Sequence, residues 1–170
     1  MTKGENDIFR ILNISNEKMK ALIQRVLSSK LEIDKKEYSK IEKGFLVLLG
    51  ITHEDTEEEM KVLAEKIVKL RVFEDENGKM NLSIKDVKGS LHIVSQFTLY
   101  ADCHHGNRPS FINAAKPEYA NELYEKFIKY CKEELNMNVE TGSFGADMKI
   151  TLVNDGPVTI MLECKEGKIL

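Results

Sequence analysis

The chain has 170 residues and carries 25 lysine and arginine residues against 28 aspartate and glutamate residues, a formal net charge of −3. A single domain of this length buries enough surface to fold without disulfides or a structural metal. With 42% hydrophobic and 31% charged residues, the composition excludes disordered and collagen-like classes. No apolar run approaches the roughly 20 residues of a membrane-spanning helix, so no membrane association is expected. The charge also excludes a general DNA-coating protein, which needs a strong basic excess.

Cysteine usage fits a reducing compartment. Cys103, Cys131 and Cys164 are odd in number and far apart, which is typical of reduced thiols rather than of a disulfide framework. The run Cys103-His104-His105 offers metal-ligating side chains, but adjacent ligands rarely converge on one ion and no second cluster completes the coordination. We therefore expect a surface loop here, with no metal and no cofactor.

The first 18 residues are predicted to be an N-terminal extension (1–18) that precedes a single domain (19–170). This segment has neither the arginine-rich character of an organelle transit peptide nor the long apolar stretch of a secretory signal. A cytoplasmic location is therefore expected. The short apolar group from Ile8 to Ile14 could form one amphipathic helix that docks on the domain.

Two extended segments and a helix are predicted in the first part of the domain. Ala21–Val26 has strand character, and Gly44–Ile51 is apolar without alternation, as in a strand covered on both faces. This second strand is predicted to be central. Thr56 and Glu59 then form a capping-box signature, and apolar residues recur at helical spacing as far as Leu70.

The second part of the domain alternates between strands and a second helix. Arg71–Phe73 resumes an extended segment, Asn77-Gly78 supplies a turn, and Leu91–Tyr100 is predicted to be one long strand. Pro117 suits the first position of a helix, and apolar residues follow it at helical spacing. Two closing strands are predicted, Ile150–Val153 and Val158–Leu162. Because no repeat or linker is present, all elements are expected to share one α/β core.

Three polar side chains interrupt the predicted strand Leu91–Tyr100. If this strand is buried, Ser95, Gln96 and Thr98 need hydrogen-bond partners, because an unsatisfied buried polar group is costly. Strand alternation places Gln96 and Thr98 on one face, and Ser95 and Phe97 on the other. The alternative is a half-solvated strand whose polar residues point outward, and the residues alone favour it.

Other segments give weaker signals. Gly156-Pro157 lies between two strand-like runs, where proline turns or ends the pairing, and the residues alone favour a plain turn over a cis bond. Gly142–Gly145 is a loop whose glycines permit unusual dihedral angles. His53 and His92 have no nucleophile or acid partner nearby in sequence, so a Ser-His-Asp site has little support.

Two of these segments resemble the signature motifs of the D-aminoacyl-tRNA deacylases, namely Ser95–Tyr100 and Asn154–Thr159. Further similar segments follow the same order along the chain. They are Ile23–Val26, Lys43–Gly50, Asn107–Phe111 and Gly142–Met148. The resemblance covers nearly everything from Met19 to Glu163, and family members usually begin at a residue equivalent to Met19.

The resemblance implies a fold and an assembly. The fold would be a single α/β domain of mixed, mostly antiparallel β-sheets packed with two main helices, in the β/β/α layers of the family. The assembly would be a homodimer with both active sites at the subunit interface. In the family, the residues matching Gly156 and Pro157 are joined by a cis bond and reach into the partner's pocket. Their main-chain carbonyls hold the amino group of a D-aminoacyl ester, and an L side chain is excluded by the same backbone.

The resemblance also implies roles for individual residues. The catalytic set would be Ser95, Gln96, Phe97 and Thr98, and the substrate-binding set Gly156, Pro157, Phe144, Met148 and Arg25. Backbone N–H groups around Gln96 and Phe97 would stabilise the developing oxyanion, since an aminoacyl ester is already activated. Thr98 has no evident base beside it, so a positioning role is expected rather than covalent attack. Arg25 would order the interface near the Gly-Pro segment.

The expected function is hydrolysis of the ester bond of D-aminoacyl-tRNA at its 3′ acceptor end, a proofreading step in translation. Glycyl-tRNA, including glycine mischarged on tRNA-Ala, would also be cleaved because glycine has no side chain to exclude. One alternative is a nucleic-acid-binding module on the same fold, in which residues 1–18 recruit a partner. A sibling deacylase for L-alanyl-tRNA errors is disfavoured, because Ser95-Gln96 and Asn154–Pro157 follow the D-specific form.

Two observations on charge bear on an RNA substrate. The loop Cys103–Arg108 is less basic than the corresponding loop in many relatives of the family. Five acidic residues between Glu54 and Glu59 lie at one helix start, and setting them aside leaves a net charge of +2 on the rest of the chain. The acidity is therefore local, and it is compatible with a few phosphate contacts.

Overall fold

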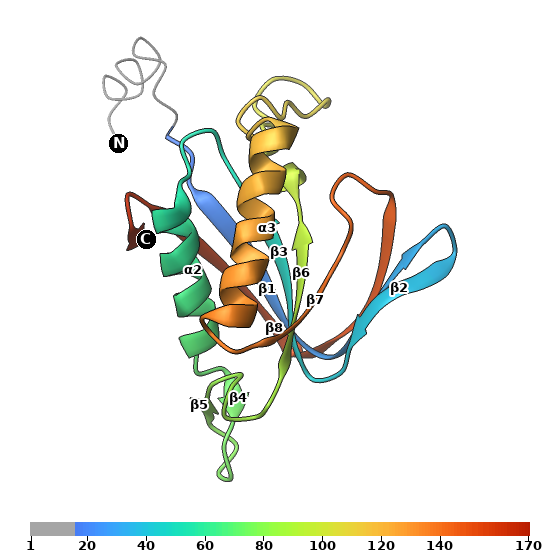
Figure 1. The fold of residues 1–170 in the computed structure, drawn as a ribbon, viewed down its shortest axis with the longest axis vertical. Helices are drawn as coiled ribbons and strands as arrows, with labels where there is room; N and C mark the ends of the chain where they lie inside the picture. Colours follow the sequence, from blue (N-terminus) through green and yellow to red (C-terminus); the bar gives the residue numbers. More distant parts are fainter. Residues whose placement is uncertain (1–15) are drawn as a thin grey trace.

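The computed structural model describes residues 16–170, which form a curled main sheet, a small two-stranded sheet, two long helices and one short 3-10 helix (Figure 1). The predicted apolar helix between Ile8 and Ile14 lies outside the described residues. The strands of the main sheet are β1 (Met19–Ile33), β2 (Lys36–Ile41), β3 (Gly44–Gly50), β6 (Ser90–Ser95), β7 (Asn138–Thr141), β8 (Met148–Lys165) and β9 (Lys168–Ile169). The short strands β4 (Phe73–Glu74) and β5 (Met80–Leu82) pair with each other. The helices are α2 (Glu57–Lys69), α3 (Pro117–Glu133) and the 3-10 helix η1 (Phe97–Tyr100).

The strand order of the main sheet is β7-β6-β3-β1-β8-β9, with β2 pairing the far half of β1. The β3–β6 and β6–β7 pairs are parallel, and the remaining pairs are antiparallel. This confirms the predicted α/β fold with a mixed, mostly antiparallel sheet and two main helices. It also confirms that the apolar run beginning at Gly44 forms a central strand, because β3 lies between β6 and β1.

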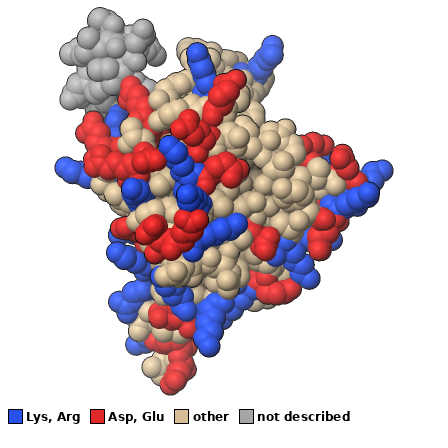
Figure 2. All heavy atoms as spheres, in the orientation of Figure 1, with Lys and Arg blue, Asp and Glu red and all other residues tan. Residues whose placement is uncertain are grey.

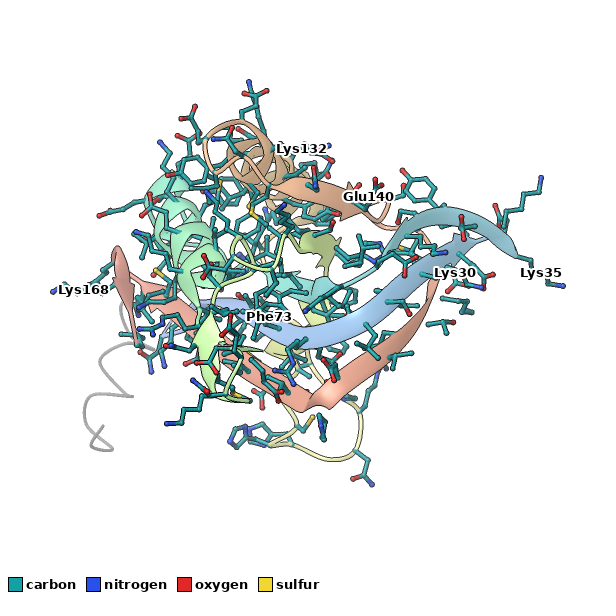
Figure 3. All side chains as sticks on the ribbon, turned by 90° about the horizontal axis from the view of Figure 1, so that it is seen from below. Lys30, Lys35, Phe73, Lys132, Glu140 and Lys168 are labelled. Atoms are coloured by element: carbon teal, nitrogen blue, oxygen red, sulfur yellow. The ribbon has the colours of Figure 1, made fainter. Side chains whose placement is uncertain are left out.

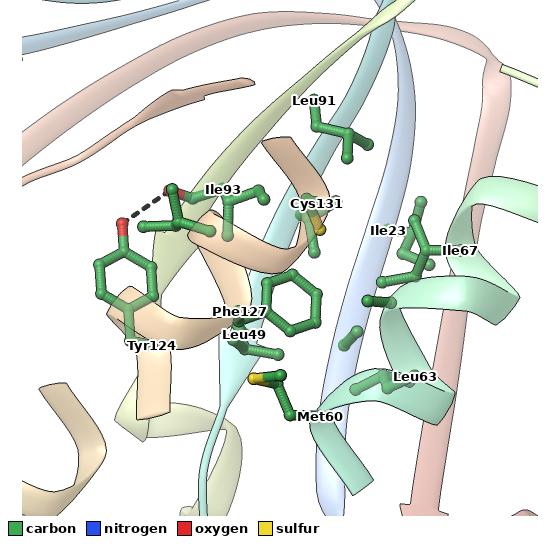
Figure 4. Close-up of a cluster of buried hydrophobic side chains, with 14 of the residues drawn as sticks. Ile23, Leu49, Met60, Leu63, Ile67, Leu91, Ile93, Tyr124, Phe127 and Cys131 are labelled. Carbon is green, nitrogen blue, oxygen red and sulfur yellow. Dashed lines mark hydrogen bonds between the residues drawn. The ribbon is translucent and has the colours of Figure 1, made fainter. Parts of the chain in front are cut away.

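Both long helices begin where local chemistry predicts. Thr56 is the N-cap of α2, and the Glu59 carboxylate accepts a 2.8 Å hydrogen bond from the Thr56 backbone N–H, which completes the capping box. Pro117 occupies the first turn of α3. The two helices pack on one face of the sheet, where Leu63, Ile67 and Phe127 join the larger core (Figure 4).

The opposite face of the sheet carries a second, smaller core. Its buried members are Val26, Leu31, Ile41, Leu46 and Val94. In Figure 3 both helices lie on one side of the sheet, and the hairpin that carries Lys30 and Lys35 extends away from them. Half-buried side chains of β8 complete this smaller core, among them Met148 and Ile150. The sheet is thus apolar on both faces, although helices cover only one of them.

Two predicted boundaries were wrong. The strand predicted over Leu91–Tyr100 ends at Ser95, because its partner β3 ends at Gly50 and the chain then turns into η1. The predicted alternation of Gln96 and Thr98 on one strand face therefore does not apply. The two predicted closing strands are a single strand, β8, whose pairing with β1 is interrupted opposite Arg25, between Asn154 and Thr159.

The surface mixes charges of both signs. Figure 2 shows acidic and basic side chains interspersed over the two helices, and a broad surface with few charged side chains beside them. No helix in residues 16–170 has the length and apolar character needed to cross a membrane.

Candidate active site

A cavity of about 700 Å³ lies beside the N-terminal end of α3. Three segments that are far apart in the sequence form its walls. The first is the end of β6 with the start of η1, the second is the segment 111–117 that leads into α3, and the third is the segment 144–148 that leads into β8. The walls are mostly apolar, with Lys116 and Asp147 as the charged side chains among them.

The first wall contains two hydrogen-bond donors that have no partner among the described residues. The Gln96 backbone N–H donates to the Leu49 carbonyl at 2.8 Å, as the last bond of the sheet ladder. Beyond this point the Phe97 N–H makes no hydrogen bond within residues 16–170, because the first N–H groups of a helix have no partner in it. The half-buried Ser95 hydroxyl also has no partner among the described residues. Both residues line the cavity, so two donors without a partner belong to its wall.

Unlike the Ser95 hydroxyl and the Phe97 N–H, the Thr98 hydroxyl has a hydrogen-bond partner. It accepts a hydrogen bond from the Gln96 side-chain amide, and Thr98 does not line the cavity. No basic side chain contacts this hydroxyl in the described part of the chain. Phe97 is 57% exposed, and its ring meets Phe111 edge-on with the ring centroids 5.1 Å apart. This aromatic pair joins the first wall to the second.

The second wall is anchored to the end of β3. The Thr52 hydroxyl donates to the Asn113 carbonyl at 2.6 Å, and His53 Nε2 donates to the Ile112 carbonyl at 2.6 Å. Thr52 in turn donates its backbone N–H to the Asp55 carboxylate at 2.7 Å. Burial of Asp55 raises the pKa of its carboxyl group to about 7, although the Thr52 hydrogen bond acts in the opposite direction.

The third wall contains two of the predicted site residues. The Phe144 ring lies against Tyr124 of α3, with the ring centroids 6.1 Å apart. Met148 belongs both to the cavity lining and to the smaller core. Asp147 pairs with Lys149 at 2.7 Å, so the acidic group of this wall has a basic partner. Among the described residues, no group of three acidic, cysteine or histidine side chains is placed to hold a metal ion.

The Gly156-Pro157 segment lies away from this cavity within one chain. The peptide bond between the two residues is cis, and both are exposed. Arg25, which is 4% exposed, clamps this segment to the chain before β4: its Nε donates to the Asp155 carbonyl at 3.0 Å, and its Nη1 donates to the Val72 carbonyl at 2.6 Å. The side chain of Asn154 accepts a 2.9 Å hydrogen bond from the Val158 N–H and spans the segment.

The structure thus sorts the predicted site residues into two groups. Ser95, Gln96, Phe97, Phe144 and Met148 line one cavity, whereas Arg25, Thr98, Gly156 and Pro157 do not. The prediction missed most of the second wall, from Ile112 to Lys116. One signal in the sequence could have found this wall. Pro117 marks the start of α3, so the residues just before it lie at the N-terminal end of a helix.

Comparisons with known proteins identify the family of this chain. The family model described as D-Tyr-tRNA(Tyr) deacylase matches residues 22–163. This chain belongs to that family. A D-aminoacyl-tRNA deacylase of Thermosipho africanus is 56% identical over 148 residues, which cover 87% of this chain and 99% of that protein. One from Clostridium botulinum strain Loch Maree is 59% identical with the same coverage.

Solved structures give the same fold. The structure of a c-Myc DNA unwinding element binding protein has a TM-score of 0.80 and 40% identity, covering 86% of this chain and 99% of that one. A probable eukaryotic D-amino acid tRNA deacylase has a TM-score of 0.74 at 16% identity, covering 86% and 100%, which shows the fold alone. The family prediction is therefore confirmed, and with it the prediction of a hydrolase that acts on ester bonds.

Proposed function

We propose that this protein hydrolyses the ester bond of D-aminoacyl-tRNA and releases the free D-amino acid and tRNA. The observation that carries the proposal is the cavity, which Ser95, Phe97, Phe144 and Met148 line and where the Phe97 N–H and the Ser95 hydroxyl have no hydrogen-bond partner among the described residues. An aminoacyl ester is already activated, so a placed water and a fixed N–H donor suffice to accelerate its hydrolysis.

The proposed reaction follows from these groups. Water adds to the ester carbonyl, and the Phe97 N–H donates to the oxygen on which negative charge develops. The tetrahedral intermediate then expels the 3′ oxygen of the terminal adenosine, which takes a proton. We assign Ser95 and Gln96 to shaping the adenosine and ester site, and the adenosine 2′-hydroxyl to assisting proton transfer. Thr98 holds Gln96 through the hydrogen bond between their side chains.

The test uses D-tyrosyl-tRNA and L-tyrosyl-tRNA with the purified chain. We expect rapid loss of the D ester and persistence of the L ester. The proposal is overturned if D-tyrosyl-tRNA stays intact while an established deacylase cleaves it in a parallel reaction. Glycyl-tRNA is the third substrate, and we expect its cleavage because glycine has no side chain to exclude.

We further propose a homodimer in which the Gly156-Pro157 segment of one chain enters the cavity of the other. Within one chain this segment is exposed and lies outside the cavity, yet Arg25 holds it firmly. Arg25 belongs to β1 and the Gly-Pro segment to β8. Both strands also carry exposed apolar side chains, namely Leu27 of β1 and Val153 and Met161 of β8. Burying such side chains against a second copy favours association.

Mixed dimers test this arrangement directly. A chain with the cavity variant Phe97→Pro is combined with a chain carrying the segment variant Arg25→Ala. If each site takes its cavity from one chain and its Gly-Pro segment from the other, each mixed dimer contains one intact site. In an equal mixture half of the dimers are mixed, so half of the sites with an intact cavity meet a wild-type segment, and we expect the D-tyrosyl to L-tyrosyl ratio to rise clearly above that of Arg25→Ala alone. If both elements act within one chain, the ratio stays at the value of Arg25→Ala.

The selection of D-amino acids would come from the backbone of the Gly-Pro segment. Main-chain carbonyls that hold the amino group leave no room for an L side chain, whereas a D side chain points elsewhere. This selectivity fits a proofreading role in translation, carried out in the cytoplasm.

A nucleic-acid-binding role on the same fold is the second candidate. It is favoured by the similarity to the c-Myc DNA unwinding element binding protein. Deleting residues 1–18 separates the two candidates. Loss of nucleic-acid binding with intact hydrolysis would favour the binding module, whereas unchanged hydrolysis and unchanged tRNA affinity would favour the deacylase alone.

A further inference from the structure

Three polar side chains form a row inside the smaller core. His92 of β6 is fully buried, and it lies between Ser29 of β1 and Ser39 of β2. His92 Nδ1 is 2.9 Å from the Ser29 hydroxyl, and His92 Nε2 is 2.8 Å from the Ser39 hydroxyl. Ser39 also donates its hydroxyl proton to the carbonyl of Thr141 at 2.7 Å.

The positions of the protons in this row follow from the donors available. Ser39 has a single hydroxyl proton, and the Thr141 carbonyl can only accept, so that proton lies between them. The contact between Ser39 and His92 must then use the proton on Nε2. Burial lowers the pKa of His92 to about 4, so the ring is neutral and its Nδ1 accepts from Ser29. Every member of the row is satisfied in one arrangement only.

The row ends at the base of the third cavity wall. Thr141 is the last residue of β7, and Gly142 follows it directly. A Cβ atom on Gly142 would lie 2.6 Å from the Met148 sulfur and 3.5 Å from a methyl group of Val94, two residues that line the cavity. A shift of the backbone at Thr141 would therefore be transmitted to Met148.

The same backbone is also held from the helix side. The Ile93 carbonyl accepts from the Tyr124 hydroxyl at 2.8 Å (Figure 4) and from the Gly142 N–H at 3.3 Å. Tyr124 fixes Ile93 and contacts Phe144. From the sheet side, Ser39 donates a side-chain hydrogen bond to the Thr141 carbonyl, and His92 orients the Ser39 hydroxyl.

We propose that His92 and Ser39 are positioning residues for the reaction, because they hold the segment 142–148 where its side chains meet the substrate. This inference rests on the function proposed above. Neither residue touches the cavity, so both act through Thr141 and Met148. Misplacing a substrate-binding wall by a fraction of an ångström lowers the rate without removing any group that takes part in the chemistry.

The test compares variants of Ser39 and His92 well below their melting temperatures. Ser39→Ala removes the bond to Thr141, and we expect kcat/KM for D-tyrosyl-tRNA to fall about tenfold, carried mainly by KM. His92→Leu should have a similar effect. His92→Gln keeps an N–H donor for Ser39, and we expect it to restore most of the loss. Ile67→Val is the matched control, since it weakens the core on the helix side and should leave both constants unchanged.

Hydrogen exchange supplies a second readout. In Ser39→Ala and His92→Leu, the amides of residues 142–147 should exchange faster than in the wild type, while those of α2 keep their protection. The inference is overturned if KM and this exchange stay at wild-type values, or if His92→Gln is as impaired as His92→Leu. If the wild-type chain itself fails to cleave D-tyrosyl-tRNA, the proposed function fails, and the exchange alone decides whether this row holds the segment.

Discussion

The cavity wall at Ser95–Phe97 and the Gly156-Pro157 segment differ in whether their polar groups have hydrogen-bond partners. At the wall, the Phe97 N–H and the Ser95 hydroxyl have no partner in residues 16–170, and both residues line the cavity. At the segment, Arg25 and Asn154 hold the backbone on both sides of the Gly-Pro bond. Unoccupied donors suit a site where charge develops, and a clamped backbone suits a surface that selects by shape.

Replacing the donor at the wall should have the largest effect. Phe97→Pro removes one N–H at the first position of η1, where a short helix tolerates proline. If this N–H stabilises the oxyanion, kcat for D-tyrosyl-tRNA should fall about 100-fold to 1,000-fold with little change in KM. Steady-state kinetics measures both constants. Phe97→Leu is the control, because it removes the ring and keeps the donor, and equal losses in the two variants would refute the assignment.

Releasing the clamp at the segment should have the next largest effect. Arg25→Ala leaves the Asp155 and Val72 carbonyls without their donor, so the segment loses its fixed position. We expect the ratio of D-tyrosyl to L-tyrosyl cleavage to fall about tenfold or more, measured as kcat/KM on each ester.

The control for the clamp is a second arginine that bonds a carbonyl. Arg71 Nε donates to the Asn81 carbonyl at 2.9 Å in an exposed position, so Arg71→Ala should leave the ratio unchanged. Arg25→Lys keeps the charge, but one ammonium group cannot replace a guanidinium that donates in two directions. A wild-type ratio in Arg25→Ala would mean that selection does not depend on this clamp.

Asp55, which supports the second wall through Thr52, should make the free energy of unfolding depend on pH. Folding raises the pKa of Asp55 from 3.8 to about 7, so its contribution is fully present below pH 3.8 and is lost as the pH rises through 7. Asp55→Asn stays neutral and can still accept from Thr52. We expect it to be more stable than the wild type at pH 8, with a margin about 2 kcal/mol larger than at pH 5.5.

Urea unfolding at the two pH values measures this margin. The lowered pKa of His92 acts in the opposite direction below pH 6.5, but this contribution is common to both chains and cancels in the comparison. A margin that does not change with pH would show that the Asp55 carboxyl is not the titrating group.

Local sequence signals predicted where the helices begin, whereas contacts between residues far apart in the sequence determine the geometry of the site. Thr56 with Glu59 and Pro117 each mark a helix start within a few residues, so both helices could be read from the sequence. The end of β6 could not, because it depends on where β3 ends, about 45 residues earlier. Arg25 finds its partners at Val72 and Asp155, which no spacing in the sequence connects, so its place near the Gly-Pro segment was expected from the family resemblance alone.

Thr98 should give the smallest effect, and it tests whether the wall works by its backbone alone. Thr98→Val keeps the shape and removes a hydroxyl that accepts from Gln96, does not line the cavity and has no base beside it. We expect kcat/KM for D-tyrosyl-tRNA to change by about threefold or less. A nucleophile would lose orders of magnitude on the same change and would leave a covalent aminoacyl-enzyme detectable by mass spectrometry in the wild type. A loss in kcat/KM beyond about 100-fold would therefore refute a wall that works by its backbone alone, and it would assign a catalytic role to the Thr98 side chain.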